Sequence, residues 1–107
     1  MSHHLGATGR VHVNASKAGL EGLVRGLAME LAPHNITANA VAPGSIDTVR
    51  GASAGGPQGR GLSREIPLGR QGRPEEIAAL VRFLVGPEGR YITGQTVHVN
   101  GGLFLGK

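Results

Sequence analysis

The stretch Pro43-Gly44-Ser45-Ile46-Asp47-Thr48 decides the fold of this chain. It follows Ile36 to Ala42, a run of mostly small side chains that predicts a parallel strand covered on both faces. Pro43-Gly44 stops that strand. In an open α/β sheet, ligands bind at the loop that leaves the carboxyl end of a strand. The stretch therefore predicts an α/β domain with a binding loop, although Pro-Gly is also common in plain strand-ending turns.

A long helix is predicted before this strand, from about Ala15 to Ala32, and residues 1–12 are predicted to form a loop. The helix has a stripe of leucines that we expect to face the sheet. Beside the stripe lies a second face of small residues: Ala15, Ala18, Gly19, Gly22 and Gly26. Glycine inside a helix costs up to ~1 kcal/mol relative to alanine, so this face indicates close packing against another backbone.

The elements after the binding loop complete an α/β order. Residues 49–66 are rich in glycine and almost free of apolar pattern, which predicts a mobile loop, and loops of this length are usually functional lids or disordered. A second helix is predicted from Pro74 to Gly86-Pro87, and Glu75-Glu76 suit its positive amino end rather than a catalytic pair. Thr96 to Val99 is predicted as a strand. The order helix, strand, loop, helix, strand is α/β.

Composition excludes several classes of function. The chain has 107 residues, a formal net charge of +4 and no cysteine. Its basic residues are scattered, without a compact run or interleaved aromatic rings, so we expect no nucleic-acid partner. No apolar run approaches the ~20 residues of a membrane span, and the first residues lack the features of a signal peptide. Disulfides and thiolate metal sites are excluded, and the five histidines lack a ligand spacing. We therefore expect a cytoplasmic protein without a metal site.

Several motifs in one order resemble the second half of a short-chain dehydrogenase/reductase, a Rossmann-fold family of NAD(P)-dependent oxidoreductases. Residues 14–20 (NASKAGL) precede the strand and Pro43-Gly44, and the later motifs lie at residues 66–70 (IPLGR), 74–78 (PEEIA), 92–95 (ITGQ) and 99–102 (VNGG). The resemblance is greatest to the branch of 3-oxoacyl-acyl-carrier-protein reductases. It implies that residues 1–107 are a partial domain, the carboxyl-terminal half of a doubly wound parallel sheet.

The resemblance also implies a set of catalytic positions. In the family, a Tyr-x-x-x-Lys pair places a proton donor and a cation together, and the cation lowers the tyrosine pKa. Lys17 matches the lysine, but the tyrosine position is Val13, which has no ionisable group. His12 is a conceivable substitute acid, although its side chain diverges from the direction of position 13. Ser2 matches, with a small gap, a serine that polarises the substrate carbonyl. The plainer interpretations are a solvated loop histidine, an exposed lysine and an unremarkable second residue.

The cofactor implied is NAD or NADP. In the family, the backbone after Pro-Gly meets the nicotinamide amide, which corresponds to Pro43, Gly44 and Ile46, and a threonine hydroxyl corresponds to Thr48. Lys17 corresponds to the residue that holds the ribose. The printed residues contain no Gly-x-x-x-Gly-x-Gly loop, which presents backbone amides to the pyrophosphate. We therefore expect this chain alone not to bind the dinucleotide at micromolar concentration.

Two functions remain open from the sequence. The first is a fragment of an NAD(P)-dependent enzyme that interconverts a small-molecule carbonyl and alcohol. The second is a non-catalytic interaction protein that keeps the family scaffold, which the valine in place of tyrosine favours. In both cases we expect a homo-oligomer through the helix at residues 15–32, because its small residues let backbones approach closely.

Overall fold

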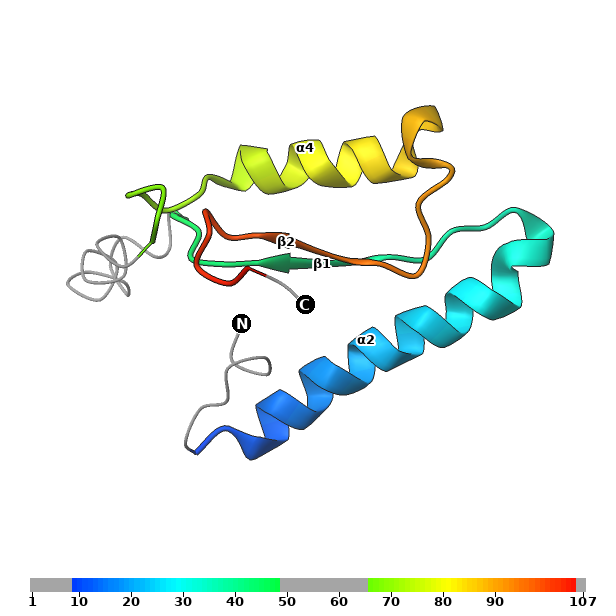
Figure 1. The fold of residues 1–107 in the computed structure, drawn as a ribbon, viewed down its shortest axis with the longest axis horizontal. Helices are drawn as coiled ribbons and strands as arrows, with labels where there is room; N and C mark the ends of the chain where they lie inside the picture. Colours follow the sequence, from blue (N-terminus) through cyan, green and yellow to red (C-terminus); the bar gives the residue numbers. More distant parts are fainter. Residues whose placement is uncertain (1–8, 49–65, 106–107) are drawn as a thin grey trace. The chain divides into compact units, whose positions relative to one another are not determined.

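The computed structural model describes residues 9–48 and 66–105 (Figure 1). The elements in chain order are α2 (Val11–Leu31), η1 (Ala32–His34), β1 (Ala40–Pro43), α4 (Pro74–Val85), η2 (Pro87–Gly89) and β2 (Thr96–Val99). The chain divides into two units, one of residues 1–41 and 83–97 and the other of residues 42–82 and 98–107. The predicted α/β order is confirmed, as are the second helix and the last strand.

Helix α2 begins at Val11, four residues before the predicted start. The prediction of a loop over residues 1–12 is therefore wrong at its last two positions. The boundary was hidden because Arg10, the residue before the helix, offers no side-chain cap, and the first turn contains no acidic residue. The carboxyl end follows the prediction, since Asn35 adopts a left-handed conformation (φ 59°) after η1.

The leucine stripe of α2 is not covered in the part of the chain that the structure describes. Leu20 is 53% exposed and Leu23 is 56% exposed. Ala28, at 4%, is the buried residue of this helix, and its Cβ lies 3.4 Å from where a Cβ on Gly94 would stand. The expectation that the stripe faces the sheet stays a prediction.

The two strands form a two-stranded parallel sheet, β1 beside β2. The Ala40 N–H donates to the Gln95 carbonyl at 2.8 Å, and the Gly44 N–H donates to the Val99 carbonyl at 2.9 Å. The residue numbers of the hydrogen-bonded partners therefore increase in the same direction along both strands, as they do in a parallel sheet. The described residues therefore contain two strands of the predicted parallel sheet.

Strand β1 is shorter than the predicted Ile36 to Ala42. Before Ala40, side chains replace part of the backbone ladder: the Ala38 carbonyl still accepts the Gly94 N–H at 2.7 Å, but the Ala38 N–H donates to the Thr93 Oγ1 at 3.1 Å. The Asn39 side chain bridges the same two segments, donating to the Ile92 carbonyl at 2.9 Å and accepting from the Gln95 N–H at 3.1 Å. Short polar side chains offer the backbone such alternatives to a regular ladder. The correction is therefore local, because the segment keeps its neighbour and loses only its strand geometry.

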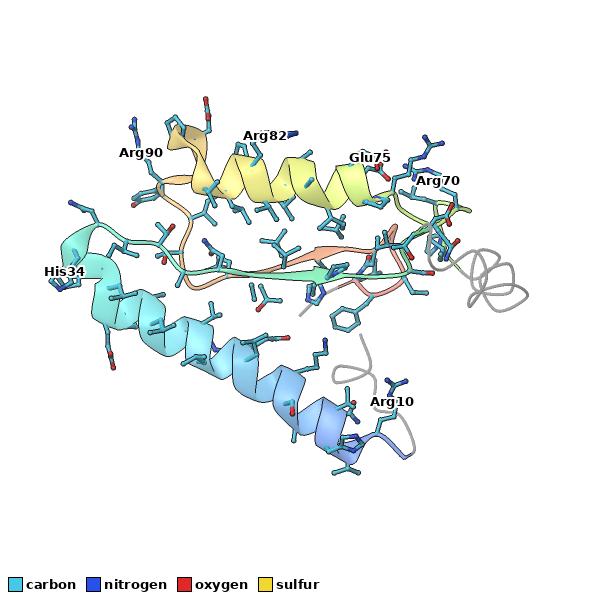
Figure 2. All side chains as sticks on the ribbon, turned by 180° about the vertical axis from the view of Figure 1, so that it is seen from behind. Arg10, His34, Arg70, Glu75, Arg82 and Arg90 are labelled. Carbon is cyan, nitrogen blue, oxygen red and sulfur yellow. The ribbon has the colours of Figure 1, made fainter. Side chains whose placement is uncertain are left out.

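Helix α4 begins at Pro74, as predicted, and its amino end is capped. The Glu76 carboxylate accepts the Arg73 N–H at 2.9 Å, which is one half of a capping box. The same carboxylate forms a two-point ion pair with Arg70, with both N···O distances at 2.9 Å. Figure 2 shows Arg70 beside the start of this helix, where Glu75 also lies. The interpretation of the acidic pair as a helix-start feature is confirmed for Glu76.

Among the residues that the structure describes, the buried apolar ones are few: Ala28, Ile66 and Leu84. Ile66 is 3% exposed, so the last residue of the loop predicted over 49–66 is packed rather than free. The rest of that predicted loop, residues 49–65, lies outside the described residues. Across the described ranges, no helix is long and apolar enough to cross a membrane, and no three potential metal ligands cluster.

Candidate functional site

Gly44 lies where β1 ends, and it is packed against the end of β2. A Cβ built on Gly44 would stand 2.6 Å from the Asn100 Cβ and 2.9 Å from the Asn100 Cα. Real side chains do not approach this closely, and a backbone atom cannot move aside cheaply. Glycine at position 44 therefore lets the turn after β1 lie directly on the turn after β2.

Beyond Gly44 the chain stays extended and changes its partner. Ile46 forms a parallel bridge with Gly72. The Gly72 N–H donates to the Ser45 carbonyl at 3.0 Å, and the Asp47 N–H donates to the Gly72 carbonyl at 2.8 Å. A Cβ on Gly72 would stand 2.9 Å from the Ile46 Cδ1, so the end of the Ile46 side chain would have to shift to make room for it.

The bridge determines which way the backbone of Ile46 faces. In a parallel bridge, the flanking groups of one residue bond to its partner, while that residue's own N–H and C=O point to the opposite side. Within residues 9–48 and 66–105, neither the N–H nor the C=O of Ile46 makes a hydrogen bond. One donor and one acceptor thus lie together on one edge, which complements the C=O and NH2 of a primary amide.

Gln71 holds the same segment through a side chain. Its Nε2 donates to the Ser45 Oγ at 2.8 Å, and both residues are half-buried. Sequence reasoning missed Gln71 and Gly72, because 26 residues separate Gln71 from Ser45 and no spacing rule connects the two. Only the folded path of the chain between β1 and α4 brings them together.

The turn at residues 100–102 supports the other side of Gly44. The Asn100 Oδ1 accepts the Gly102 N–H at 3.0 Å, and the Asn100 Nδ2 donates to the Phe104 carbonyl at 3.0 Å. Gly101 has a positive φ of 62°, and its carbonyl accepts the Leu68 N–H at 3.1 Å. The motif at residues 99–102 served the sequence analysis only as part of a resemblance. Its structural role is to form the surface on which Gly44 rests.

A shallow depression of about 110 Å³ lies beside this turn. Its lining residues are Leu68, Arg70, Gly72, Glu76, Val99, Asn100 and Gly101. The side-chain hydrogen bond from Arg70 and the backbone hydrogen bond from Arg73 lower the pKa of Glu76 to about 2. The same pairing raises the pKa of Arg70. The charges of Arg70 and Glu76 therefore offset each other, and this ion pair presents no net charge to a ligand in the depression.

The predicted catalytic residues on α2 lie in the other unit. Val13 and Lys17 are four residues apart on the helix, which places them on one face. Lys17 and His12 are both exposed. His12 is in the first turn of the helix rather than in the predicted loop, and successive helix positions diverge, so it does not share the direction of Val13. Ser2 lies outside the described residues.

The predicted cofactor residues fall into the same two groups. Pro43, Gly44, Ile46 and Thr48 belong to one short segment of the second unit, and Thr48 is exposed at its end. Lys17 belongs to the first unit. The structure therefore brings four of the five predicted cofactor residues together along one stretch of backbone.

Comparison with known proteins gives a consistent result. Residues 1–104 match the family described as enoyl-(acyl carrier protein) reductase. The 3-oxoacyl-(acyl-carrier-protein) reductase of Aquifex aeolicus is 48% identical over 99 residues, which are 92% of this chain and 40% of that protein. The protein of the same name from Pseudomonas aeruginosa is 48% identical over 101 residues, 94% of this chain and 41% of that protein.

A solved structure agrees at the level of the fold. The short-chain dehydrogenase/reductase of Brucella melitensis, a glucose/ribitol dehydrogenase by name, superposes with a TM-score of 0.88 at 33% identity. The superposition covers 99% of this chain and 43% of that one. The chain thus spans about two fifths of the length of the curated relatives it matches. With the family match over residues 1–104, these similarities show that the chain belongs to the short-chain dehydrogenase/reductase family, close to its 3-oxoacyl-acyl-carrier-protein reductase-like branch.

Proposed function

We propose that residues 1–107 are the carboxyl-terminal part of an NAD(P)-dependent oxidoreductase that interconverts a carbonyl and an alcohol. The observation that carries this proposal is the backbone edge of Ile46, where a donor and an acceptor face away from Gly72 together. A nicotinamide carboxamide presents the complementary acceptor and donor. The edge is formed before any ligand is present, which reduces the entropy cost of binding.

Each residue of the segment then has a distinct part in holding the cofactor. Ile46 would hold the carboxamide, with its N–H as the donor and its carbonyl as the acceptor. Pro43 and Gly44 set the path that leads to this edge, and the exposed Thr48 hydroxyl serves the carboxamide or a phosphate. Lys17 binds the ribose hydroxyls. When bound, the nicotinamide ring supplies or accepts a hydride.

The proton is the difficult part of this function. General acid catalysis needs an ionisable group within hydrogen-bond reach of the substrate oxygen. Val13 shares a helix face with Lys17 and offers no proton. His12 and Ser2 remain as candidate proton donor and carbonyl-polarising group. The valine favours the second candidate function, a non-catalytic interaction protein that keeps the family scaffold.

The substrate class proposed first is a 3-oxoacyl thioester, because the similar proteins of Aquifex aeolicus and Pseudomonas aeruginosa carry that substrate in their names. We also propose the cytoplasm as its location, since the sequence contains no cysteine and the substrate class is metabolic.

The proposal is tested on the natural polypeptide that contains residues 1–107. Binding of NADH and NADPH is measured by calorimetry, and turnover is followed by cofactor absorbance with a 3-oxoacyl thioester. Binding with turnover supports the enzyme, whereas binding without turnover supports the non-catalytic family member. In the second case, Val13→Tyr is expected to create measurable turnover. Failure to bind either dinucleotide overturns the proposed function.

The printed chain gives a separate comparison. We expect residues 1–107 alone to show no binding of NADH or NADPH at micromolar concentration, because the sequence holds no glycine-rich loop for the pyrophosphate. A single tight site in a calorimetric titration of this chain would contradict that expectation.

We propose a homo-oligomer that is formed through α2. A Cβ built on Gly19, Gly22 or Gly26 meets no heavy atom of another described segment within 4 Å, so this face is open to a second copy. Gly22→Leu is expected to release folded monomer, as measured by light scattering together with circular dichroism, while Glu30→Gln on the same helix serves as a control. A compact, well-folded monomer of the unmodified protein at high concentration overturns this proposal.

A further inference from the structure

We infer that Gln71 is a positioning residue for the cofactor edge of Ile46, acting through Ser45. The inference rests on the proposed function, because the edge matters only if a nicotinamide amide pairs with it. Gln71 itself faces Ser45 rather than the edge: its Nε2 donates to the Ser45 Oγ at 2.8 Å. The residue is therefore assigned no contact with cofactor or substrate.

The inference follows from the hydrogen bonds that hold the segment from Gly44 to Asp47. Its amino end is fixed by the hydrogen bond from Gly44 to Val99, and its carboxyl end by the hydrogen bond from Asp47 to Gly72. Between these two points the Gln71 amide is the side-chain hydrogen bond that reaches Ser45 in the described residues. A backbone edge that binds a planar amide at two points tolerates little rotation, since both hydrogen bonds require near-linear geometry. The contact to Ser45 restrains that rotation at the residue directly before Ile46.

A second feature makes the contact effective. Gln71 precedes Gly72, whose N–H and C=O both bond to the segment. Two successive residues, Gln71 and Gly72, therefore hold residues 45–47: Gln71 through its side chain and Gly72 through its backbone. Loss of the side-chain bond leaves the backbone bridge in place, so we expect a looser segment and not an unfolded one.

The first experiment measures the segment without any cofactor. Amide hydrogen exchange is followed in the protein and in Gln71→Met, which keeps the length of the side chain and loses the donor. Exchange at Asp47 and Gly72 is expected to accelerate about 5-fold, in line with the loss of one hydrogen bond. Exchange at Ala40, which bonds to the backbone of Gln95, is expected to stay unchanged. The matched control is Gln95→Met. Among the described residues, the Gln95 side chain donates only to the Thr93 carbonyl.

The second experiment measures binding by the natural polypeptide that contains this chain. Dissociation constants are compared for NADH or NADPH and for ADP-ribose, which lacks the nicotinamide. Gln71→Met is expected to weaken the nicotinamide dinucleotide about 5-fold and to leave ADP-ribose unchanged. Gln71→Glu is expected to recover part of the loss, because its carboxylate can accept the Ser45 hydroxyl at similar reach. Adding Ser45→Ala to Gln71→Met is expected to cause no further loss.

The outcomes separate the inference from the proposed function. If the unmodified protein binds neither NADH nor NADPH, the proposed function fails and this inference fails with it. If it binds the dinucleotide no more tightly than ADP-ribose, the Ile46 edge adds nothing to binding and the inference alone is overturned. If it binds the dinucleotide selectively but Gln71→Met changes neither constant, or changes both equally, only the inference is overturned. Unchanged exchange at Asp47 and Gly72 overturns it as well. A selective loss with the partial rescue supports it.

Discussion

The glycines of α2 and the glycines at positions 44 and 89 have opposite surroundings. A Cβ added at Gly19 or Gly26 in the helix meets no atom of another described segment within 4 Å. A Cβ added at Gly44 or Gly89 would stand closer than 3.0 Å to several atoms of residues that it does not neighbour in the chain. The same residue type therefore marks open space in one region and the tightest contacts in the other.

The difference shows what each set of glycines contributes. In the turns, a missing Cβ allows two segments of backbone to meet, and the candidate cofactor loop depends on one such meeting. In the helix, each glycine costs up to ~1 kcal/mol of helix stability without a compensating contact among the described residues. A cost that nothing in the described structure offsets is the reason for proposing a partner at this face. Substitutions at matched positions test both halves of the comparison.

The largest expected effect is at Gly89, which is buried. Alanine there would place its Cβ 2.5 Å from the Leu84 carbonyl oxygen and 2.6 Å from the Phe83 carbonyl oxygen. Since both are backbone atoms, the end of α4 must move. We expect Gly89→Ala to lower the free energy of unfolding by about 3 kcal/mol, as in severe overpacking. Urea denaturation measures it, with Gly26→Ala as the control that should not destabilise. An unchanged midpoint would show that η2 adapts easily.

Gly44→Ala is expected to cost about 2 kcal/mol, because its Cβ meets the Asn100 side chain and Cα. The effect should be smaller than at Gly89, since two atoms lie within 3.0 Å of the added Cβ at position 44 and three lie within that distance at position 89. Denaturation is again the measurement, and Gly22→Ala is the control. Normal stability in Gly44→Ala would contradict the close packing of the two turns.

The helix glycines should respond in the opposite direction. Gly19→Ala and Gly26→Ala are each expected to raise the free energy of unfolding by about 0.5–1 kcal/mol, because alanine is the better helix former and space is open. The two sites are two turns apart, so their effects should add. Denaturation at low and high protein concentration checks the result. The gain is expected at low concentration, where the monomer dominates, and the proposed second copy should reduce it at high concentration. An equal gain at both concentrations would contradict the proposed contact at this face.

The smallest effect is expected at Glu76, whose carboxylate is exposed. Its pKa is lowered to about 2 from 4.5, so the ionised form favours the folded state. That contribution is complete above pH 4.5 and is lost as the pH falls toward 2. Glu76→Gln keeps an acceptor for the Arg73 N–H and loses the ion pair. Thermal denaturation from pH 7 to pH 2 should show the variant and the protein converging in acid. As a control, Glu75→Gln removes the same charge but keeps the ion pair between Arg70 and Glu76. The difference in thermal stability between this variant and the protein should therefore not shrink in acid through loss of that pair.

Local signals in the sequence were sufficient for part of the fold. Pro74 and Gly86-Pro87 bound α4 as predicted, because proline and glycine act through their own backbone geometry. The start of α2 was not predictable, since Arg10 carries no capping group. The length of β1 was not predictable either, because the side chain of Asn39 occupies positions of the ladder.

The candidate site divides in the same way. The segment from Pro43 to Thr48 could be found from its own residues, since a strand that stops at Pro-Gly indicates a loop at the edge of a sheet. Gln71 could not be found, because its role depends on a contact between segments that only folding brings together. The predicted placement of Lys17 relative to this loop remains a prediction.

The change of partner after β1 also has a mechanical consequence. Up to Gly44 the chain is tied to β2, and from Ser45 to Asp47 it is tied to Gly72 instead. Gly72 lies at the end of the segment that leads from Ile66 into α4. A displacement of Gly72 would be transmitted to Ile46 through two backbone hydrogen bonds, one to the residue on each side of it. The position of the Ile46 edge is therefore coupled to the position of the segment that leads into α4.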